Sequence, residues 1–382
     1  MKFSVLLPTR NGGQFLRDCI RSILEESYED FELIVSDNAN TDETPGILRS
    51  FAGDKRLKVV RLETVVSVTD NWNHALSSSS GDYFVMMGDD DFLLPGYFNR
   101  MEDVLKKYDN PDCVMYSGFI YVMPNSINGN TRSYYDKVHF KFGPDFAKEG
   151  VMPAAMRFSI VRDMYHFRAR TPLRMQTTLV SRKAAAGVPG GIFLPPFPDY
   201  YAMNALFLSA ERWVYHPENL VIVGVSPKSF GHFFYSNQQK KGLKYLGIES
   251  DFKGRLPGNE LINQSHVGLS LLKTNFQDKL KGVEISRPNY VRRQVYYWYM
   301  QYKSGVISFG DLMGMASNLS LMDWARLFLS VMDRESWIRV FRMFKFSGRN
   351  DIQKIWYGLC PLDGVLNIKE FRDWVSKKFR KI

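Results

Sequence analysis

The 382-residue sequence has few of the residues that build disulfide-bonded or zinc-scaffolded folds. Its three cysteines, Cys19, Cys113 and Cys360, are far apart and odd in number, which argues against a disulfide framework or a CxxC zinc site and suits a reducing compartment. No run of 18 apolar residues occurs, so we expect no membrane-spanning helix. The first apolar run is short and is interrupted by proline and arginine, unlike a signal peptide. We therefore expect a cytoplasmic protein.

Several motifs of common enzyme classes are also absent. The sequence contains no GxGxxG, GxxxxGK[ST], GxSxG or HExxH pattern, which argues against dehydrogenase, P-loop and hydrolase functions. Hydrophobic residues make up 45% and charged residues 24%, an ordinary globular composition. The length allows two or three domains.

Positive charge is unevenly distributed. Residues 236–382 contain 25 lysines and arginines against 13 acidic residues, whereas residues 1–235 contain 25 against 27. The whole positive excess therefore lies in the C-terminal part, which indicates a difference in partners between the two parts.

The first 115 residues alternate between strand and helix patterns. Apolar strands are predicted at residues 3–8, 31–37, 57–62, 82–87 and 113–118, with helical patterns between them. Such apolar strands, separated by helices, predict an α/β fold with a mainly parallel sheet covered on both faces. Ligands of such sheets bind at the carboxyl ends of the strands. Beyond residue 118 the pattern is less regular, and after residue 236 it is mainly helical.

Three consecutive aspartates, Asp89, Asp90 and Asp91, follow the fourth predicted strand. Side chains at i and i+2 of an extended segment point the same way, so we expect Asp89 and Asp91 to face one site. A divalent cation such as Mg²⁺ or Mn²⁺ would relieve the repulsion among these carboxylates, and it prefers carboxylate and phosphate oxygens. The alternative is a solvated acidic turn that caps the helix after Pro95. Because the aspartates follow a buried strand, we favour a metal site.

Polar residues also follow the second predicted strand, in "SDNANTDET". Asp37 and Asn38 could hydrogen-bond a base or a ribose. Helix capping by the residues that follow is compatible with this role, because the strand end and the cap are different residues.

Two more side chains could take part in chemistry. Asp199, in "FPDYY", precedes a predicted helix and could act as a general base, although the position taken alone favours a helix cap. His232 could be a third metal ligand, since imidazole binds Mn²⁺, and the alternative is a packed or surface histidine.

The order of these motifs resembles that of family 2 glycosyltransferases, which have the GT-A fold. Four segments carry the resemblance, namely "SVLLPTRN", "DFELIVSDNANTDET", "NHALSSSSGDY" and "GDDDFLLP". They occur in the family's order over about 95 residues. The sequence departs from the family's pattern at Asn38, where an acidic residue is frequent, and at Trp72, where a basic residue is frequent.

The resemblance implies an inverting glycosyltransferase of the hexosyltransferase type. Its donor would be a nucleoside-diphosphate sugar, and its acceptor a saccharide or lipid-linked saccharide in surface glycan synthesis. Asp199 matches the family's acidic general base, and Asp89, Asp91 and His232 would hold Mn²⁺ or Mg²⁺. The donor would bind to Pro8, Thr9, Arg10, Asn11, Asp37, Asn38, Asn73, Asp89 and Asp90.

The residue pattern and the resemblance, which reaches only to about residue 235, together divide the chain into three regions. Residues 1–117 would bind the nucleotide sugar, and residues 118–235 would form the acceptor-binding and catalytic half. Residues 236–382 would form a basic, aromatic-rich helical domain.

The stretches 291–303, 336–346 and 370–382 of the C-terminal region mix basic and aromatic residues, which is typical of helices that lie on an anionic membrane surface. The alternatives for this region are an inward-packed helical domain, a homo-oligomer interface, or nucleic-acid binding, although no nucleic-acid-binding motif is present. For the enzyme as a whole, a nucleotidyltransferase would also use paired aspartates and a metal.

Overall fold

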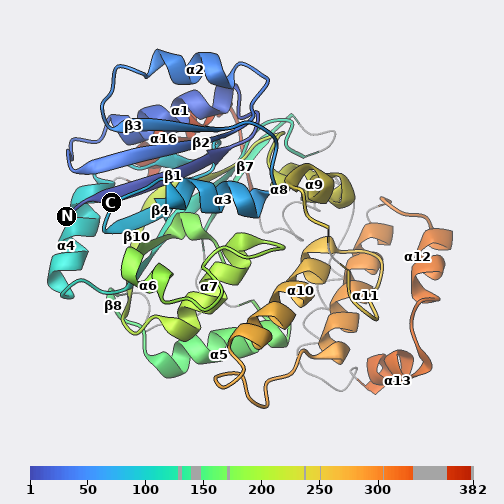
Figure 1. The fold of residues 1–382 in the computed structure, drawn as a ribbon. Coiled ribbons are helices and arrows are strands. Elements are labelled where there is room, and N and C mark those ends of the chain that lie inside the picture. The colour runs from blue at the N-terminus through green and yellow to red at the C-terminus, as the bar shows by residue number, and fades with distance from the viewer. Residues whose placement is uncertain are drawn as a thin grey trace.

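The computed structural model describes residues 1–127, 131–138, 148–169, 173–235, 238–249, 251–303, 305–329 and 359–379. Within these residues, eleven strands form one sheet with helices on both of its faces (Figure 1). The strands are β1 Phe3–Thr9, β2 Phe31–Asn38, β3 Leu57–Leu62, β4 Tyr83–Met86, β5 Phe92–Leu93, β6 Cys113–Val122, β7 Ser133–Lys137, β8 Gly150–Val151, β9 Thr178–Ser181, β10 Trp213–Val225 and β11 Cys360–Leu362.

Helices connect and cover these strands. They are α1 Gln14–Leu24, α2 Thr44–Ser50, α3 Val68–Ser77, α4 Tyr97–Lys107, α5 Ala154–Tyr165, the 3₁₀ helix η2 Met175–Thr177, α6 Arg182–Ala186, α7 Pro198–Ser209, α8 Phe230–Tyr235, α9 Gln239–Leu246, α10 Glu260–Asn275, α11 Arg287–Lys303, α12 Phe309–Ala316, α13 Leu321–Leu329 and α16 Ile368–Lys378. The predicted α/β class, with a mostly helical region late in the chain, is confirmed.

The N-terminal strands pair in parallel, as predicted, and their order is β3-β2-β1-β4. Their register places Thr9 opposite Asp37, so the carboxyl ends of β1 and β2 meet at one edge of the sheet. The sheet as a whole is mixed, because β7 and β9 pair antiparallel with β6, and β9 also pairs antiparallel with β4. These antiparallel strands come from the part of the sequence whose pattern was less regular.

Two apolar clusters lie on opposite faces of the sheet. Along the strands, Leu6 and Ile34 belong to the cluster with α5, α7 and α10, whereas Val5 and Leu33 belong to the cluster with α1 and α4. This alternation follows from the two-residue period of a strand, and burial on both faces explains why the strands are almost wholly apolar.

The end of the chain returns to the sheet. Strand β11 pairs antiparallel with β7, and α16 packs its aromatic side chains on β6. The buried Phe371 ring stacks on Tyr121, with centroids 4.6 Å apart. Residues 359–379 therefore join the sheet and not the helices α10–α13. The basic aromatic stretch 336–346 lies outside the described residues.

Candidate active site

The three aspartates after β4 form a turn and point in different directions. Asp91 is 1% exposed, and both of its oxygens accept backbone hydrogen bonds, from the Gly88 N–H at 2.5 Å and from the Gly224 N–H at 2.9 Å. The expectation that Asp89 and Asp91 face one site is therefore wrong in its geometry, because the alternation rule applies only to extended backbone. Asp91 fastens the turn to β10.

Hydrogen bonds also anchor Asp89 and Asp90. Asp90 Oδ2 accepts from the Ser226 N–H at 2.9 Å, and Asp89 Oδ2 accepts from the Thr9 hydroxyl at 2.7 Å. The Ser226 side chain and the backbone of Asp90 itself also hydrogen-bond the Asp90 carboxyl and lower its pKa. Asp89 and Asp90 are the better candidates to hold a cation, because both oxygens of Asp91 already accept backbone hydrogen bonds.

The carboxylates of the aspartate turn are buried close to one another, which disfavours their ionised forms. Burial, followed by repulsion from Asp90, raises the pKa of both Asp89 and Asp91 to about 7. Burial also raises the pKa of Asp90. Two cations oppose these shifts, since the charge of Lys228 lowers the pKa of Asp89 and that of Arg174 lowers the pKa of Asp90 and Asp91. A divalent cation would reduce the same repulsion.

Asp199 lies in the first turn of α7, directly after Pro198. Its Oδ1 accepts a hydrogen bond from the Tyr200 N–H at 2.9 Å. Burial raises the pKa of Asp199 to about 6, against the opposing effects of the Tyr200 N–H and the charge of Arg174. The charge of Arg174 lowers the pKa of Asp199 as well as the pKa of Asp90 and Asp91. Sequence reasoning missed Arg174, which lies in no motif.

The predicted donor-binding residues of β2 lie at the same edge of the sheet, but their side chains hydrogen-bond to other residues of the chain. Asp37 Oδ2 accepts from Arg61 at 2.7 Å, and Asp37 Oδ1 accepts from the Asn40 N–H at 2.8 Å. Asn38 binds the main chain of Val66 with both ends of its amide, at 2.8 and 3.0 Å. These two side chains shape the loops that border the site.

The predicted residues at the end of β1 lie beside them. Pro8 pairs with Ser36 in the sheet register, and Thr9 reaches across to Asp89. Asn11 Oδ1 accepts from the Thr41 N–H at 2.9 Å, which links the β1 and β2 loops. The structure therefore brings Pro8, Thr9, Asn11, Asp37 and Asp89 together.

Helix α9 reaches this edge from the C-terminal region. The Tyr245 hydroxyl donates to the main-chain oxygen of Arg10 at 2.6 Å, and the Arg10 guanidinium lies 4.5 Å from the centre of the Tyr245 ring. At the other end of α9, Gln239 donates to the Tyr297 hydroxyl of α11 at 2.6 Å. The C-terminal helices thus border the end of β1, a contact that no sequence motif indicated.

Two predicted residues lie apart from the aspartate turn. Asn73, on α3, donates to the main-chain oxygen of Phe193 at 3.0 Å and so holds the loop that leads to α7. His232 places Nδ1 3.0 Å from the main-chain oxygen of Ser126. Among the described residues no group of three His, Cys, Asp or Glu side chains is arranged to hold a metal, so His232 does not complete a ligand set with the aspartates.

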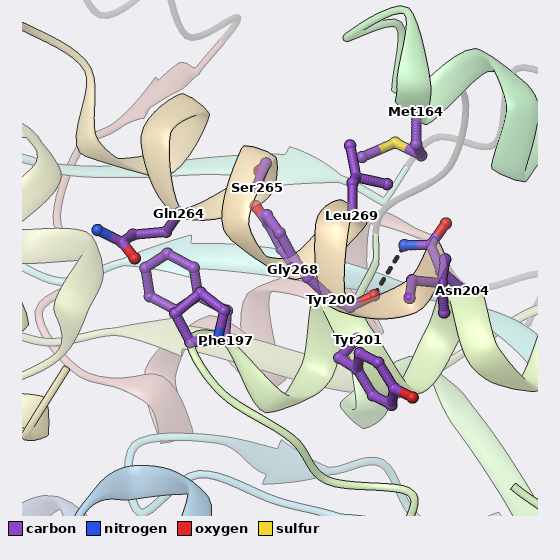
Figure 2. Close-up of a pocket in the computed structure, with 11 residues that line it drawn as sticks. Met164, Phe197, Tyr200, Tyr201, Asn204, Gln264, Ser265, Gly268 and Leu269 are labelled. Carbon is purple, nitrogen blue, oxygen red and sulfur yellow. Dashed lines mark hydrogen bonds between the residues drawn. The ribbon is translucent and has the colours of Figure 1, made fainter. Parts of the chain in front are cut away.

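A small cavity lies between α7 and α10, beside Tyr200 (Figure 2). Its space for a water-sized molecule is about 10 Å³, enough for roughly one water. The side-chain amide oxygen of Asn204, Oδ1, is buried without a hydrogen bond within the described residues and would suit such a water. The cavity is therefore too small for a sugar.

Comparison with known proteins places the N-terminal part in an enzyme class. Residues 4–166, which are less than half of the chain, match the family described as "Glycosyl transferase family 2". The match spans β1 to α5 and includes the aspartate turn, but it ends before Asp199. It confirms the predicted class, a glycosyltransferase, for the segment that it covers, and it favours this class over a nucleotidyltransferase.

Particular relatives show the same likeness. The chain is 33% identical over 109 residues to the putative glycosyltransferase EpsE of Bacillus subtilis (strain 168), which is 28% of this chain and 39% of that protein. It is 27% identical over 147 residues to the glycosyltransferase GlyG of Streptococcus pneumoniae serotype 4, which is 38% of this chain and 46% of that protein. The chain therefore spans less than half the length of these relatives.

Among solved structures, S. aureus TarS 1-349 in complex with UDP-GlcNAc is similar to the chain with a TM-score of 0.48 and 15% identity. The alignment covers 79% of this chain and 81% of that one.

Proposed function

We propose that the protein is an inverting glycosyltransferase that moves a sugar from a nucleoside-diphosphate sugar to an acceptor hydroxyl. The observation that carries the proposal is the aspartate turn at the carboxyl end of β4, joined to the end of β1 by the Thr9–Asp89 hydrogen bond, together with Asp199, a second carboxyl whose pKa is raised by burial. A general base and an anion-stabilising centre are the two groups that a single displacement at an anomeric carbon needs.

The donor would lie along the carboxyl ends of β1, β2 and β4. The nucleoside would contact the loops held by Asp37 and Asn38, and the diphosphate would lie over Asp89 and Asp90. These two carboxylates suit Mg²⁺ or Mn²⁺, because such ions bind through one or two carboxylates together with substrate phosphates. When bound, the ion would supply charge neutralisation of the leaving diphosphate.

Asp199 would accept the proton of the acceptor hydroxyl. As the acceptor oxygen forms its bond to the anomeric carbon, the bond from that carbon to the diphosphate oxygen breaks on the opposite face, which inverts the configuration. A pKa of about 6 leaves Asp199 mostly ionised at neutral pH and still basic enough to take a proton. Arg174 would hold the carboxylate ionised and approach the developing negative charge.

The first experiment identifies the donor. Thermal unfolding would be measured with a panel of nucleoside-diphosphate sugars, each with Mn²⁺ or with EDTA, and the donor that stabilises the protein would be tested for nucleoside diphosphate release with saccharide acceptors. We expect one donor to stabilise the wild type and to turn over, and Asp199→Asn to keep the stabilisation but lose turnover. Absence of any stabilising donor would contradict the proposal.

The acceptor is proposed to be a saccharide or a lipid-linked saccharide, with the protein peripheral on a membrane. Of the helices in the described ranges, none is long and apolar enough to cross a membrane. The aromatic residues of α11 and α16 mostly pack inward, as Trp298 and Phe371 do. The surface that supports peripheral binding is α12–α13, whose exposed large apolar side chains are Phe309, Met313, Leu321, Met322, Trp324, Phe328 and Leu329.

A further inference from the structure

Lys228 lies near the aspartate turn, and the mechanism proposed above gives it no role. It follows β10 by three residues, two residues after the Ser226 N–H that binds Asp90. Its Nζ donates to the main-chain oxygen of Asn11 at 2.9 Å and lies 3.2 Å from Asp42 Oδ2. The chain that anchors Asp90 therefore also delivers an ammonium group to the end of β1.

Two consecutive glycines separate this ammonium group from the Asp89 carboxylate. A Cβ on Gly12 would lie 2.5 Å from Asp89 Oδ2, and a Cβ on Gly13 would lie 2.7 Å from Lys228 Nζ. A side chain at Gly12 would displace the Asp89 carboxylate, and one at Gly13 would displace Glu43 Oε1, 2.6 Å away, as well as Lys228 Nζ. Gly13 also has a φ of +54°, in the region that favours glycine. The "NGG" turn therefore lets the end of β1 pass close to both charged groups.

The ion pair with Asp42 does not account for this arrangement. The Lys228 side chain is 43% exposed, and a pair of such exposure adds little to stability. Asp42 has another partner, because its Oδ1 accepts from the Thr44 N–H at 3.0 Å at the start of α2. The Lys228 ammonium group can therefore leave Asp42 to bind a stronger anion.

We propose that Lys228 binds the diphosphate of the donor. On donor binding, the ammonium group leaves Asp42 for a phosphoryl oxygen, and it offsets the negative charge that the diphosphate gains when its bond to the anomeric carbon breaks. Lysine is suited to this role because its compact charge binds phosphate without a fixed geometry. The inference rests on the proposed function. It predicts that part of the affinity for a nucleoside diphosphate does not depend on metal.

The test compares Lys228→Met with Asp42→Asn. Binding of uridine, guanosine and thymidine diphosphates is measured by calorimetry in EDTA and again with Mn²⁺. We expect Lys228→Met to weaken the preferred diphosphate by about tenfold or more in EDTA, as for loss of a charged hydrogen bond. Lys228→Arg should retain most of the affinity. Asp42→Asn, which keeps its bond to Thr44, should bind as well as the wild type or better.

Each result of these binding measurements either supports or overturns the role of Lys228 in diphosphate binding. Equal binding by the wild type and Lys228→Met would overturn the proposal, and so would equal losses in Lys228→Met and Asp42→Asn, because the lysine would then act only through its ion pair. Circular dichroism and melting temperatures verify that the variants fold. If the wild type binds a diphosphate but transfers no sugar, the transferase proposal fails and the role of Lys228 is still decided by binding. If it binds none of them, both fail.

Discussion

The carbonyl oxygen of Asp90 lies 1.8 Å from the point that a Cβ on Gly224 would occupy. The backbone of β10 therefore touches the aspartate turn directly, and the Gly224 N–H binds Asp91 in the same place. We expect Gly224→Ala to displace the turn, to lower the free energy of unfolding by about 1–3 kcal/mol and to abolish donor binding. Chemical denaturation and calorimetry measure the two effects. Gly53→Ala is the control, because a Cβ there meets nothing within 4 Å.

Asp199 is expected to carry the proton transfer. Asp199→Asn keeps the size of the side chain and can still accept the Tyr200 N–H, so we expect the fold and the donor KM to remain. The turnover number should fall by about 10²–10⁴-fold, the usual contribution of a general base. Steady-state kinetics with the identified donor measures both quantities. A turnover number close to that of the wild type would show that another group is the base.

The pH dependence of turnover follows from the same carboxyl. Burial raises the pKa of Asp199 to about 6, and only the ionised form can accept a proton. Turnover should therefore be low at pH 5, rise with pH through about 6 and level off above pH 7. Replacing Arg174 by methionine should move the rise to higher pH, because its charge lowers the pKa of Asp199. A profile that does not move would remove Arg174 from the site.

The aspartate turn should make the metal-free protein less stable as pH rises. Burial and mutual repulsion raise the pKa of Asp89 to about 7, so the folded state keeps a proton that the unfolded state has already released. This contribution is fully present in acid and is lost between about pH 4 and pH 7. Asp89→Asn should reduce the difference between melting temperatures at pH 5 and pH 8.

The same melting experiments test for metal binding. At pH 8, Mn²⁺ or Mg²⁺ should raise the melting temperature of the wild type, because a bound cation relieves the repulsion. Asp89→Asn should not respond, although it still accepts the Thr9 hydroxyl. Samples that are treated with EDTA and receive no Mn²⁺ or Mg²⁺ serve as references. An equal response in the variant would mean that the cation binds elsewhere.

The parallel half of the sheet could be predicted from sequence because its signals are local. Apolar runs, helix periods and strand-end motifs lie within about 115 consecutive residues, and the strands of residues 3–9, 31–38 and 57–62 occur where the pattern placed them. The directions of Asp89 and Asp91 could not be predicted in this way. A run of three aspartates does not reveal whether the backbone continues as a strand or turns.

Contacts from distant segments could not be predicted. Lys228 contacts the end of β1 from the connection after β10, Tyr245 does so from α9, and the charge of Arg174 acts from the residue before η2, and none of these segments carries a motif. The packing of residues 359–379 on the sheet could not be predicted either, because strand pairing between β7 and β11 leaves no local pattern in the sequence. The aromatic and basic composition of α16 fits a membrane surface and a sheet surface equally well, and only the fold decides.

The packing of α16 on the sheet gives a stability prediction. Phe371 is fully buried and stacks on Tyr121, so Phe371→Ala should lower the free energy of unfolding by about 3–5 kcal/mol. Lys377→Ala, on the exposed side of the same helix, should change it little. Chemical denaturation of both variants measures the effect. A small loss in Phe371→Ala would mean that α16 does not pack on the sheet in solution.

The exposed apolar side chains of α12–α13 give the prediction for membranes. On α13, Leu321 is 90% exposed and Phe328 80%, although large apolar side chains seldom gather so exposed on the surface of a protein. We expect the wild type to sediment with vesicles of phosphatidylcholine and phosphatidylglycerol at low salt. Replacing Leu321 and Phe328 by serine should weaken this binding by about tenfold or more for each side chain. Val151→Ser, an exposed apolar residue on β8, should have no effect. Sedimentation that is unchanged in the double variant would contradict this surface, and a smaller hydrodynamic radius in the variant would indicate that the surface joins two copies of the chain instead.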